Sequence, residues 1–204
     1  MNKGKEFEQD FKKSLGSCGW DLWIYRPSDF GGGQASRFTN HSLCDYIVFS
    51  KDSGRLFFLE LKSTQGTSFS CPSAKDHNRL VAEQKLIDDI ESKEEKKEAV
   101  RALKELRKQL NTHDIKYHQI EDLLEIEHND TCNNMVPYFV LNFRKYDRTF
   151  LIKPTDLCLA LIETKKSSIN LADAEKYGKE LQQERIRKTQ HFAYNAGEFI
   201  KPWS

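Results

Sequence analysis

The stretch from Cys44 to Lys62 reads CDYIVFSKDSGRLFFLELK, and it predicts a β-hairpin at the centre of the fold. Its two arms, residues 44–49 and 55–62, are rich in β-branched and aromatic residues, and the intervening SKDSG is typical of a turn. Successive side chains of a strand point to opposite faces, so Glu60 and Lys62 are expected side by side, about 7 Å apart along the strand. The hairpin therefore places two charges on an otherwise apolar strand.

The segments on either side of this hairpin predict an α/β fold in which a mixed sheet carries helices on both faces. Phe7, Phe11 and Leu15 recur every four residues and predict an amphipathic helix over residues 3–15. Residues 28–42 read as a loop, and loops of that length in compact domains are often functional. The remaining expected elements are strands at 20–25, 136–144 and 149–154 and helices at 76–90, 155–162 and 171–185.

Residues 88–133 interrupt this pattern with a dense run of charge. They include thirteen acidic and eight basic residues, so this stretch is acidic and the remainder of the chain is mildly basic. Sparse apolar residues over 91–110 predict a solvated helix, with 115–126 as the returning arm of a helical hairpin, and low-complexity disorder is the alternative. We therefore expect a folded core formed by residues 1–87 and 134–204, with a charged helical insertion between them.

The overall composition narrows the class of protein and the cellular compartment that we expect. The 204 residues are 38% hydrophobic and 31% charged, enough apolar material for a packed core, which excludes wholesale disorder. No apolar run approaches the roughly 18 residues of a membrane span, and the charged N-terminal segment is unlike a signal peptide. Five widely spaced cysteines without a C-x-x-C pair argue against a disulfide framework and for a reducing, cytoplasmic compartment. The net charge of +1 is compatible with a polyanionic partner but does not demand one.

Asp45 begins the first arm of the hairpin, opposite the end of the second arm, so it is expected close to Glu60 and Lys62. Burying charges at the edge of an apolar sheet is costly unless they are paired or bind a metal. The two carboxylates and the backbone carbonyl of Leu61 offer hard oxygen ligands to Mg²⁺, with Mn²⁺ as a substitute. Lys62 can orient or activate a water beside a scissile phosphate. The pattern indicates metal-assisted phosphodiester hydrolysis, and the alternative is an ordinary ion pair.

Residues on the neighbouring elements extend this candidate site. Glu8 on the first helix can add a third carboxylate, and Gln84 on the helix after the hairpin can hydrogen-bond the nucleophilic water or a phosphate. Basic side chains can contact DNA phosphates, although each is individually more common as solvated surface. The basic candidates are Arg26, Arg37, Arg144 and Lys145.

Asp45 followed by Glu60-Leu61-Lys62 resembles the PD-(D/E)xK signature of a large nuclease superfamily. The surrounding motifs are similar, in the same order, to those of the RecU-type Holliday-junction resolvases. The resemblance covers most of the chain. Its flanking motifs are Gly4–Glu8, Ile24–Pro27, Cys44–Tyr46, Thr67–Phe69, Gln84, Tyr138–Leu141 and Phe150–Ile152.

The resemblance implies a restriction-endonuclease-like fold, a mixed β-sheet core flanked by helices, in which the helical hairpin is an insertion. It implies a homodimeric, Mg²⁺-dependent endonuclease that cuts four-way DNA junctions in recombination and repair. The implied metal ligands are Glu8, Asp45, Glu60 and Leu61, the implied catalytic residues are Asp45, Glu60, Lys62 and Gln84, and Thr67 and Ser68 are implied DNA contacts.

Two departures from the family pattern leave alternatives open. Residues 30–43, where the family has a stalk that enters the junction, are short and glycine-rich with Arg37 as their one arginine or lysine. The insertion at 88–133 is outside the family pattern, and its protein partner is unknown. The alternatives are another PD-(D/E)xK nuclease that cuts linear duplex DNA and a non-catalytic DNA-binding recombination factor.

Overall fold

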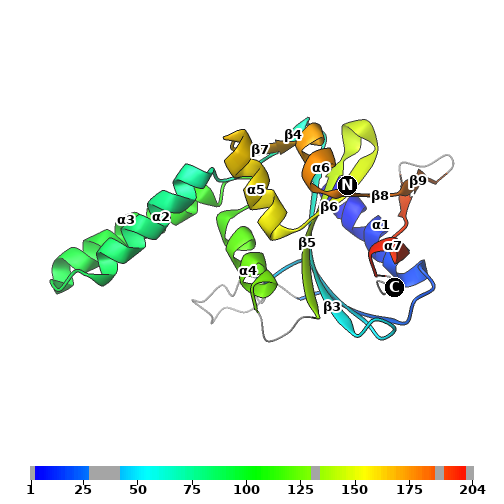
Figure 1. Ribbon diagram of the computed structural model, residues 1–204, viewed down its shortest axis with the longest axis horizontal. Coiled ribbons are helices and arrows are strands. Elements are labelled where there is room, and N and C mark those ends of the chain that lie inside the picture. The colour runs from blue at the N-terminus through cyan, green and yellow to red at the C-terminus, as the bar shows by residue number, and fades with distance from the viewer. Residues whose placement is uncertain (1–2, 28–41, 130–133, 187–190, 201–204) are drawn as a thin grey trace.

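The computed structural model describes residues 3–27, 42–129, 134–186 and 191–200, and within them six strands form one mixed sheet flanked by helices (Figure 1). The strand order is β1-β2-β3-β5-β6-β8. The central pair, β3 and β5, is parallel, and the other neighbouring pairs are antiparallel. The mixed α/β class is therefore confirmed. The strands are β1 (Leu22–Tyr25), β2 (Tyr46–Ser50), β3 (Arg55–Thr64), β5 (Met135–Phe143), β6 (Arg148–Ile152) and β8 (Lys179–Leu181).

Helices cover the sheet, and two small two-stranded sheets join loops that are distant in sequence. The small sheets pair β4 (Ser68–Ser70) with β7 (Ser168–Asn170) and β9 (Gln183–Arg185) with β10 (Phe192–Tyr194). The helices are α1 (Lys3–Ser17), α2 (Ala74–Asp88), α3 (Lys93–Leu110), α4 (Tyr117–Glu127), α5 (Pro154–Thr164), α6 (Leu171–Tyr177) and α7 (Gly197–Ile200), with a short 3₁₀ turn at Arg144–Tyr146.

The predicted central hairpin is confirmed as β2 and β3. The two strands pair antiparallel from Ser50 opposite Arg55 to Tyr46 opposite Leu59. Gly54 closes the turn with a φ of 65°, a left-handed conformation that glycine adopts without steric cost. The second predicted hairpin is also confirmed, as β5 and β6.

The alternation of side chains along β3 divides the core into two layers. Phe57, Leu59 and Leu61 face α1, where they pack with Phe7 and Phe11. Each of these two helix phenylalanines is at most 1% exposed, and truncating such a residue to alanine typically costs about 3–5 kcal/mol. The opposite face of β3 packs against α4 and α5 through its own apolar cluster, which includes Phe58, Phe139, Leu141, Ile120 and Leu157. Glu60 and Lys62 alternate with the first set, so they share the face of Phe58, as predicted.

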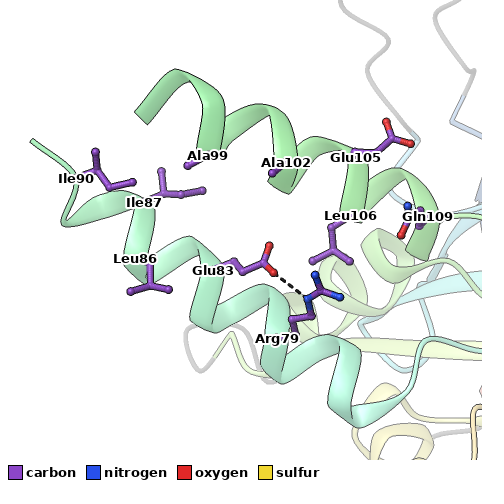
Figure 2. Close-up of a pocket in the computed structure, with 10 residues that line it drawn as sticks. All are labelled: Arg79, Glu83, Leu86, Ile87, Ile90, Ala99, Ala102, Glu105, Leu106 and Gln109. Carbon is purple, nitrogen blue, oxygen red and sulfur yellow. Dashed lines mark hydrogen bonds and ion pairs between the residues drawn. The ribbon is translucent and has the colours of Figure 1, made fainter. Parts of the chain in front are cut away.

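The predicted pairing of the insertion helices is wrong. The antiparallel partner of α3 is α2, and together they form a projecting hairpin, residues 74–110, that extends away from the sheet (Figure 1). Leu80 and Ile87 of α2 pack there with Leu103 and Leu106 of α3. Figure 2 shows the groove between the two helices, with the ion pair Arg79–Glu83 at its rim.

The expected returning arm, residues 115–126, instead belongs to the core. Ile115 and Leu123 are fully buried, and Ile120 is nearly so, all in the cluster that covers one face of the sheet. The physical reason is the width of the apolar face: α4 carries enough apolar side chains to cover a sheet, whereas α3 has a narrow stripe that suits a single partner helix. The helical hairpin that projects from the sheet therefore consists of α2 and α3, whereas we expected a helical hairpin within residues 88–133.

The net acidity of residues 88–133 does not lie on the projecting part of the molecule, where we expected it. Helix α3 has seven basic and four acidic side chains, whereas α4, which packs on the body, has four acidic side chains and neither lysine nor arginine. The acidity of residues 88–133 thus lies largely beside the sheet, and α3 on the projecting hairpin is basic.

The predicted helix at 171–185 ends early, at Tyr177. The next residue, Gly178, packs so closely that a Cβ there would lie 2.7 Å from Ile152 and 2.8 Å from a backbone oxygen. The chain then continues as the extended strands β8 and β9. Among the described residues, no helix is both long and apolar enough to cross a membrane, and the four described cysteines are free.

Candidate functional site

The site forms where β3 extends beyond its neighbour β2. Pairing with β2 ends at Leu59, whereas pairing with β5 continues to Thr64, so among the described residues no strand pairs with the other edge of residues 60–64. Asp45, immediately before β2, fills this position: its Oδ2 accepts a hydrogen bond from the Leu61 N–H at 2.8 Å. Because the N–H and C=O of one strand residue point to the same side, the Leu61 carbonyl faces the same open edge.

Glu60 and Lys62 form a contact on the neighbouring face of the same strand segment. The Lys62 Nζ lies 3.0 Å from Glu60 Oε1, and Glu60 is only 4% exposed. This is a largely enclosed ion pair rather than a solvated one, and a buried ion pair by itself contributes little net stability because both charges lose hydration. The arrangement favours a functional role for the pair over the ordinary surface ion pair that the sequence left open.

Gln119 of α4 is a site residue that the sequence analysis missed. Its Nε2 donates a short hydrogen bond to Glu60 Oε1, and its Oε1 accepts from the Lys116 backbone N–H at 3.0 Å. The two contacts fix the orientation of the amide, so the donor end faces the carboxylate. The spacing of Lys116 and Gln119 is that of a helix cap, which marks the start of α4, but only the tertiary structure brings that helix end to Glu60.

Gln84, which we expected to hydrogen-bond the nucleophilic water or a phosphate, lies on α2 in the projecting hairpin. Its Nε2 donates to Asp88 Oδ1 at 3.3 Å, one turn further along the same helix. The glutamine that contacts Glu60 is therefore Gln119 and not Gln84. Gln84 therefore lies on the helix that pairs with α3, whereas Gln119 lies on the helix that packs on the sheet.

Glu8 approaches the site from α1, on the other side of the sheet. Its Oε2 lies 2.7 Å from Arg26 Nη2, at the end of β1. Burial and the negative charge of Asp45 raise the pKa of Glu8, whereas Arg26 and, more weakly, Lys62 act in the opposite direction. Asp45 and Lys62 are therefore close enough to Glu8 to act on its charge.

The carboxylates of the site destabilise each other's charged forms. Burial, followed by the negative charge of Asp45, raises the pKa of Glu60, and Lys62 and Lys116 only partly offset this effect. A buried carboxylate, Glu60, and a half-buried one, Asp45, that raise each other's energy in this way are stabilised by a cation placed between them. The electrostatics of Asp45 and Glu60 are thus suited to binding a positive ion.

The donor set fits magnesium. Mg²⁺ is commonly held by one or two carboxylates and keeps several waters, and Asp45, Glu60 and the Leu61 carbonyl provide oxygen ligands of this kind. Among the described residues, no group of three or more His, Cys, Asp or Glu side chains is close enough to enclose a metal ion. Glu8, the third carboxylate of the expected set, is engaged with Arg26.

The expected DNA contacts occupy different environments. Arg26 is 56% exposed at the site, whereas the Arg144 side chain is only 14% exposed and pairs with Glu6 at 3.3 Å. Arg144 thus joins the end of β5 to α1, which is a structural contact. Lys145 is exposed in the β5–β6 turn, and Arg37 lies outside the described residues.

Thr67 is the last residue of the turn that follows β3, and Ser68 comes directly after that turn. Thr67 is exposed, and Ser68 begins β4, opposite Asn170 of β7. Both residues follow Lys62 by only five or six positions in the sequence, because β3 leads directly into this turn. Their placement is compatible with the expected contact to a substrate held at the open edge.

Comparisons with known proteins found no match to any protein-family model and none among the curated proteins. The chemistry of the site is therefore inferred from its own residues. These are two hard carboxylates and a carbonyl at an open strand edge, an amine held beside one carboxylate, and an amide that fixes the same carboxylate.

Proposed function

We propose that the protein is a metal-dependent endonuclease of the PD-(D/E)xK type, with a restriction-endonuclease-like fold similar to that of the RecU-type resolvases. The observation that carries the proposal is the meeting of Asp45, Glu60 and Lys62 at the open edge of β3. A helix that brings Glu8 within electrostatic range of Asp45, followed by a hairpin and a parallel strand, supports the fold assignment.

In this proposal Asp45, Glu60 and the Leu61 carbonyl hold Mg²⁺. A bound Mg²⁺ would supply charge stabilisation at the phosphoryl oxygens and lower the pKa of a bound water. Lys62 adds positive charge beside the scissile phosphate and orients the attacking water. Gln119 holds the Glu60 carboxylate in one orientation, so that its position does not depend on Lys62 alone.

The proposed substrate is branched DNA, in particular the four-way junction, cut in recombination or repair. This choice rests on the resemblance to RecU-type enzymes, in which two copies of the chain cut symmetry-related strands. We accordingly propose a homodimer, because a two-fold junction presents two equivalent scissile bonds. We expect it to act in the cytoplasm, where free thiols remain reduced.

A cleavage assay tests the proposal directly. The purified chain is incubated with a labelled synthetic four-way junction and with a linear duplex of the same sequence, in Mg²⁺ and in EDTA. We expect Mg²⁺-dependent incision of the junction that is lost in Asp45→Asn and in Lys62→Ala, with DNA binding retained in both. Glu125→Gln and Lys104→Ala serve as matched controls, because both side chains are exposed on helices and should leave cleavage unchanged.

The outcomes separate the alternatives. Equal or faster cutting of the linear duplex would assign the chain to another branch of the superfamily. Binding of DNA without cutting in Mg²⁺ or Mn²⁺ would identify a non-catalytic DNA-binding factor. If the chain neither binds nor cuts either DNA, the nuclease proposal is wrong.

A further inference from the structure

Two aromatic side chains are stacked on the surface of the edge strand β1. Trp23 is 53% exposed and Tyr25 is 42% exposed, and the rings lie with their centroids 5.5 Å apart and their planes 7° from parallel. Their cross-strand neighbours on β2 are Phe49 and Ile47, which support the rings from the adjacent strand. The aromatic pair, Trp23 and Tyr25, is thus a preorganised stack of two rings that is open to solvent.

The sheet register places the aromatic pair on the same face as the candidate site. Tyr25 is opposite Ile47, and Ile47 is opposite Phe58 of β3, two residues before Glu60. With strands about 4.8 Å apart and a rise of about 3.4 Å per residue, Tyr25 lies about 12 Å from Glu60 across the sheet. That distance corresponds to roughly three or four stacked nucleotides of a DNA strand.

We propose that Trp23 and Tyr25 form a stacking platform for unpaired bases of the DNA strand that enters the Glu60–Lys62 site. This inference rests on the nuclease function proposed above and specifies which part of the substrate is recognised next to the cut. Bases inside a duplex are already stacked, so a free aromatic surface discriminates in favour of bases exposed at branch points and strand ends.

The charges around the aromatic pair favour stacking over phosphate binding. Lys51 is paired with Asp21 at 2.8 Å, and Arg26 with Glu8 at 2.7 Å. These cations already have carboxylate partners, so they offer a strand less electrostatic attraction than unpaired lysines would. The planar rings, by contrast, present π-faces that any base can stack on without sequence preference.

The test compares strands with and without bases. The chain is made in the Asp45→Asn background to prevent cutting, and binding is measured for an oligo-dT strand of about 15 nucleotides and for an abasic strand of equal length. We expect Trp23→Ala to weaken oligo-dT binding about tenfold, the scale of one lost base–aromatic stack, and to leave the abasic strand unchanged. Trp23→Phe keeps a ring and should retain most of the affinity.

A spectroscopic measurement covers the case in which Trp23→Ala folds poorly. Replacing Trp20 and Trp203 by phenylalanine leaves Trp23 as the single tryptophan in the chain. Stacking of a thymine on its ring should quench its fluorescence, whereas the abasic strand should leave the emission intact.

Each outcome decides between the platform and its alternatives. If the Asp45→Asn chain binds junction DNA but Trp23→Ala binds oligo-dT as tightly, the platform is wrong and the proposed nuclease function stands. If Trp23→Ala instead converts a dimer to monomers without changing DNA affinity, the aromatic pair is a contact between two copies of the chain, which also overturns the platform. If no DNA binds at all, the nuclease proposal itself fails.

Discussion

Replacing Gln119 by methionine is the sharpest test of how the site is held together. Methionine has nearly the same length and no hydrogen-bonding amide, so the change removes the donor to Glu60 and the acceptor for the Lys116 N–H. A hydrogen bond to a charged group typically contributes about 1.5–3 kcal/mol, and the Lys116 N–H lies at an exposed helix end where water can replace the acceptor. Glu60 keeps Lys62 as a partner at 3.0 Å. The expected loss is therefore about 2 kcal/mol in the free energy of unfolding.

The measurement is thermal unfolding in EDTA, followed by circular dichroism. For a chain of this size, 1 kcal/mol corresponds to about 2–4 °C, so Gln119→Met should lower the Tm by about 4–8 °C. The matched control is Gln84→Met, the same substitution on the projecting hairpin, where the amide makes one long contact with Asp88. That change should cost less than about 0.5 kcal/mol.

The same two variants, Gln119→Met and Gln84→Met, should also differ in the rate of junction cleavage. Gln119→Met should slow junction incision at least tenfold, with unchanged DNA affinity, because the Glu60 carboxylate loses the group that orients it. Gln84→Met should cut like the unaltered chain. If the two variants behave alike in both stability and cleavage, the assignment of Gln119 to the site is refuted.

Three further predictions follow from the site and the packing. Mg²⁺ should stabilise the unaltered chain by about 2.7 kcal/mol at a concentration 100 times the dissociation constant. Calorimetry in Mg²⁺ and in EDTA should show this stabilisation for Glu125→Gln and not for Asp45→Asn. An equal response in both variants would place the ion elsewhere. Phe11→Ala should cost about 3–5 kcal/mol because its side chain is fully buried against the sheet, whereas Leu86→Ala, at 66% exposure, should change the urea midpoint little. Joining Leu80 to Leu106 by a short loop removes residues 81–105, the outer part of the projecting hairpin. The shortened chain should fold cooperatively and still cut, because none of the removed residues belongs to the two apolar layers on the sheet. Loss of the folding transition would show that the outer hairpin is needed for the core.

Local patterns in the sequence determined much of the fold. The alternation in RLFFLELK was sufficient to place Glu60 and Lys62 on one face, because side-chain direction in a strand depends only on a period of two. The spacing of Phe7, Phe11 and Leu15 likewise defined the face of α1 that packs on the sheet. The expected proximity of Asp45 to Glu60 also followed from the hairpin, since the turn determines which residues lie opposite one another.

The pairing of helices was decided only by the tertiary structure. The charge-rich residues 91–110 can pack their narrow apolar stripe on any helix with a matching stripe, and the sequence does not distinguish α2 from α4 as the partner. The partner of α3 depends on which helix packs on the sheet instead. Helix α4 does so, because Ile115, Ile120 and Leu123 cover Phe139 and its neighbours. Once α4 is bound to the sheet, its first turn lies beside β3, and Gln119 reaches Glu60. Contacts between segments distant in the chain arise from competition for buried surface, which periodicity within a single segment does not reveal.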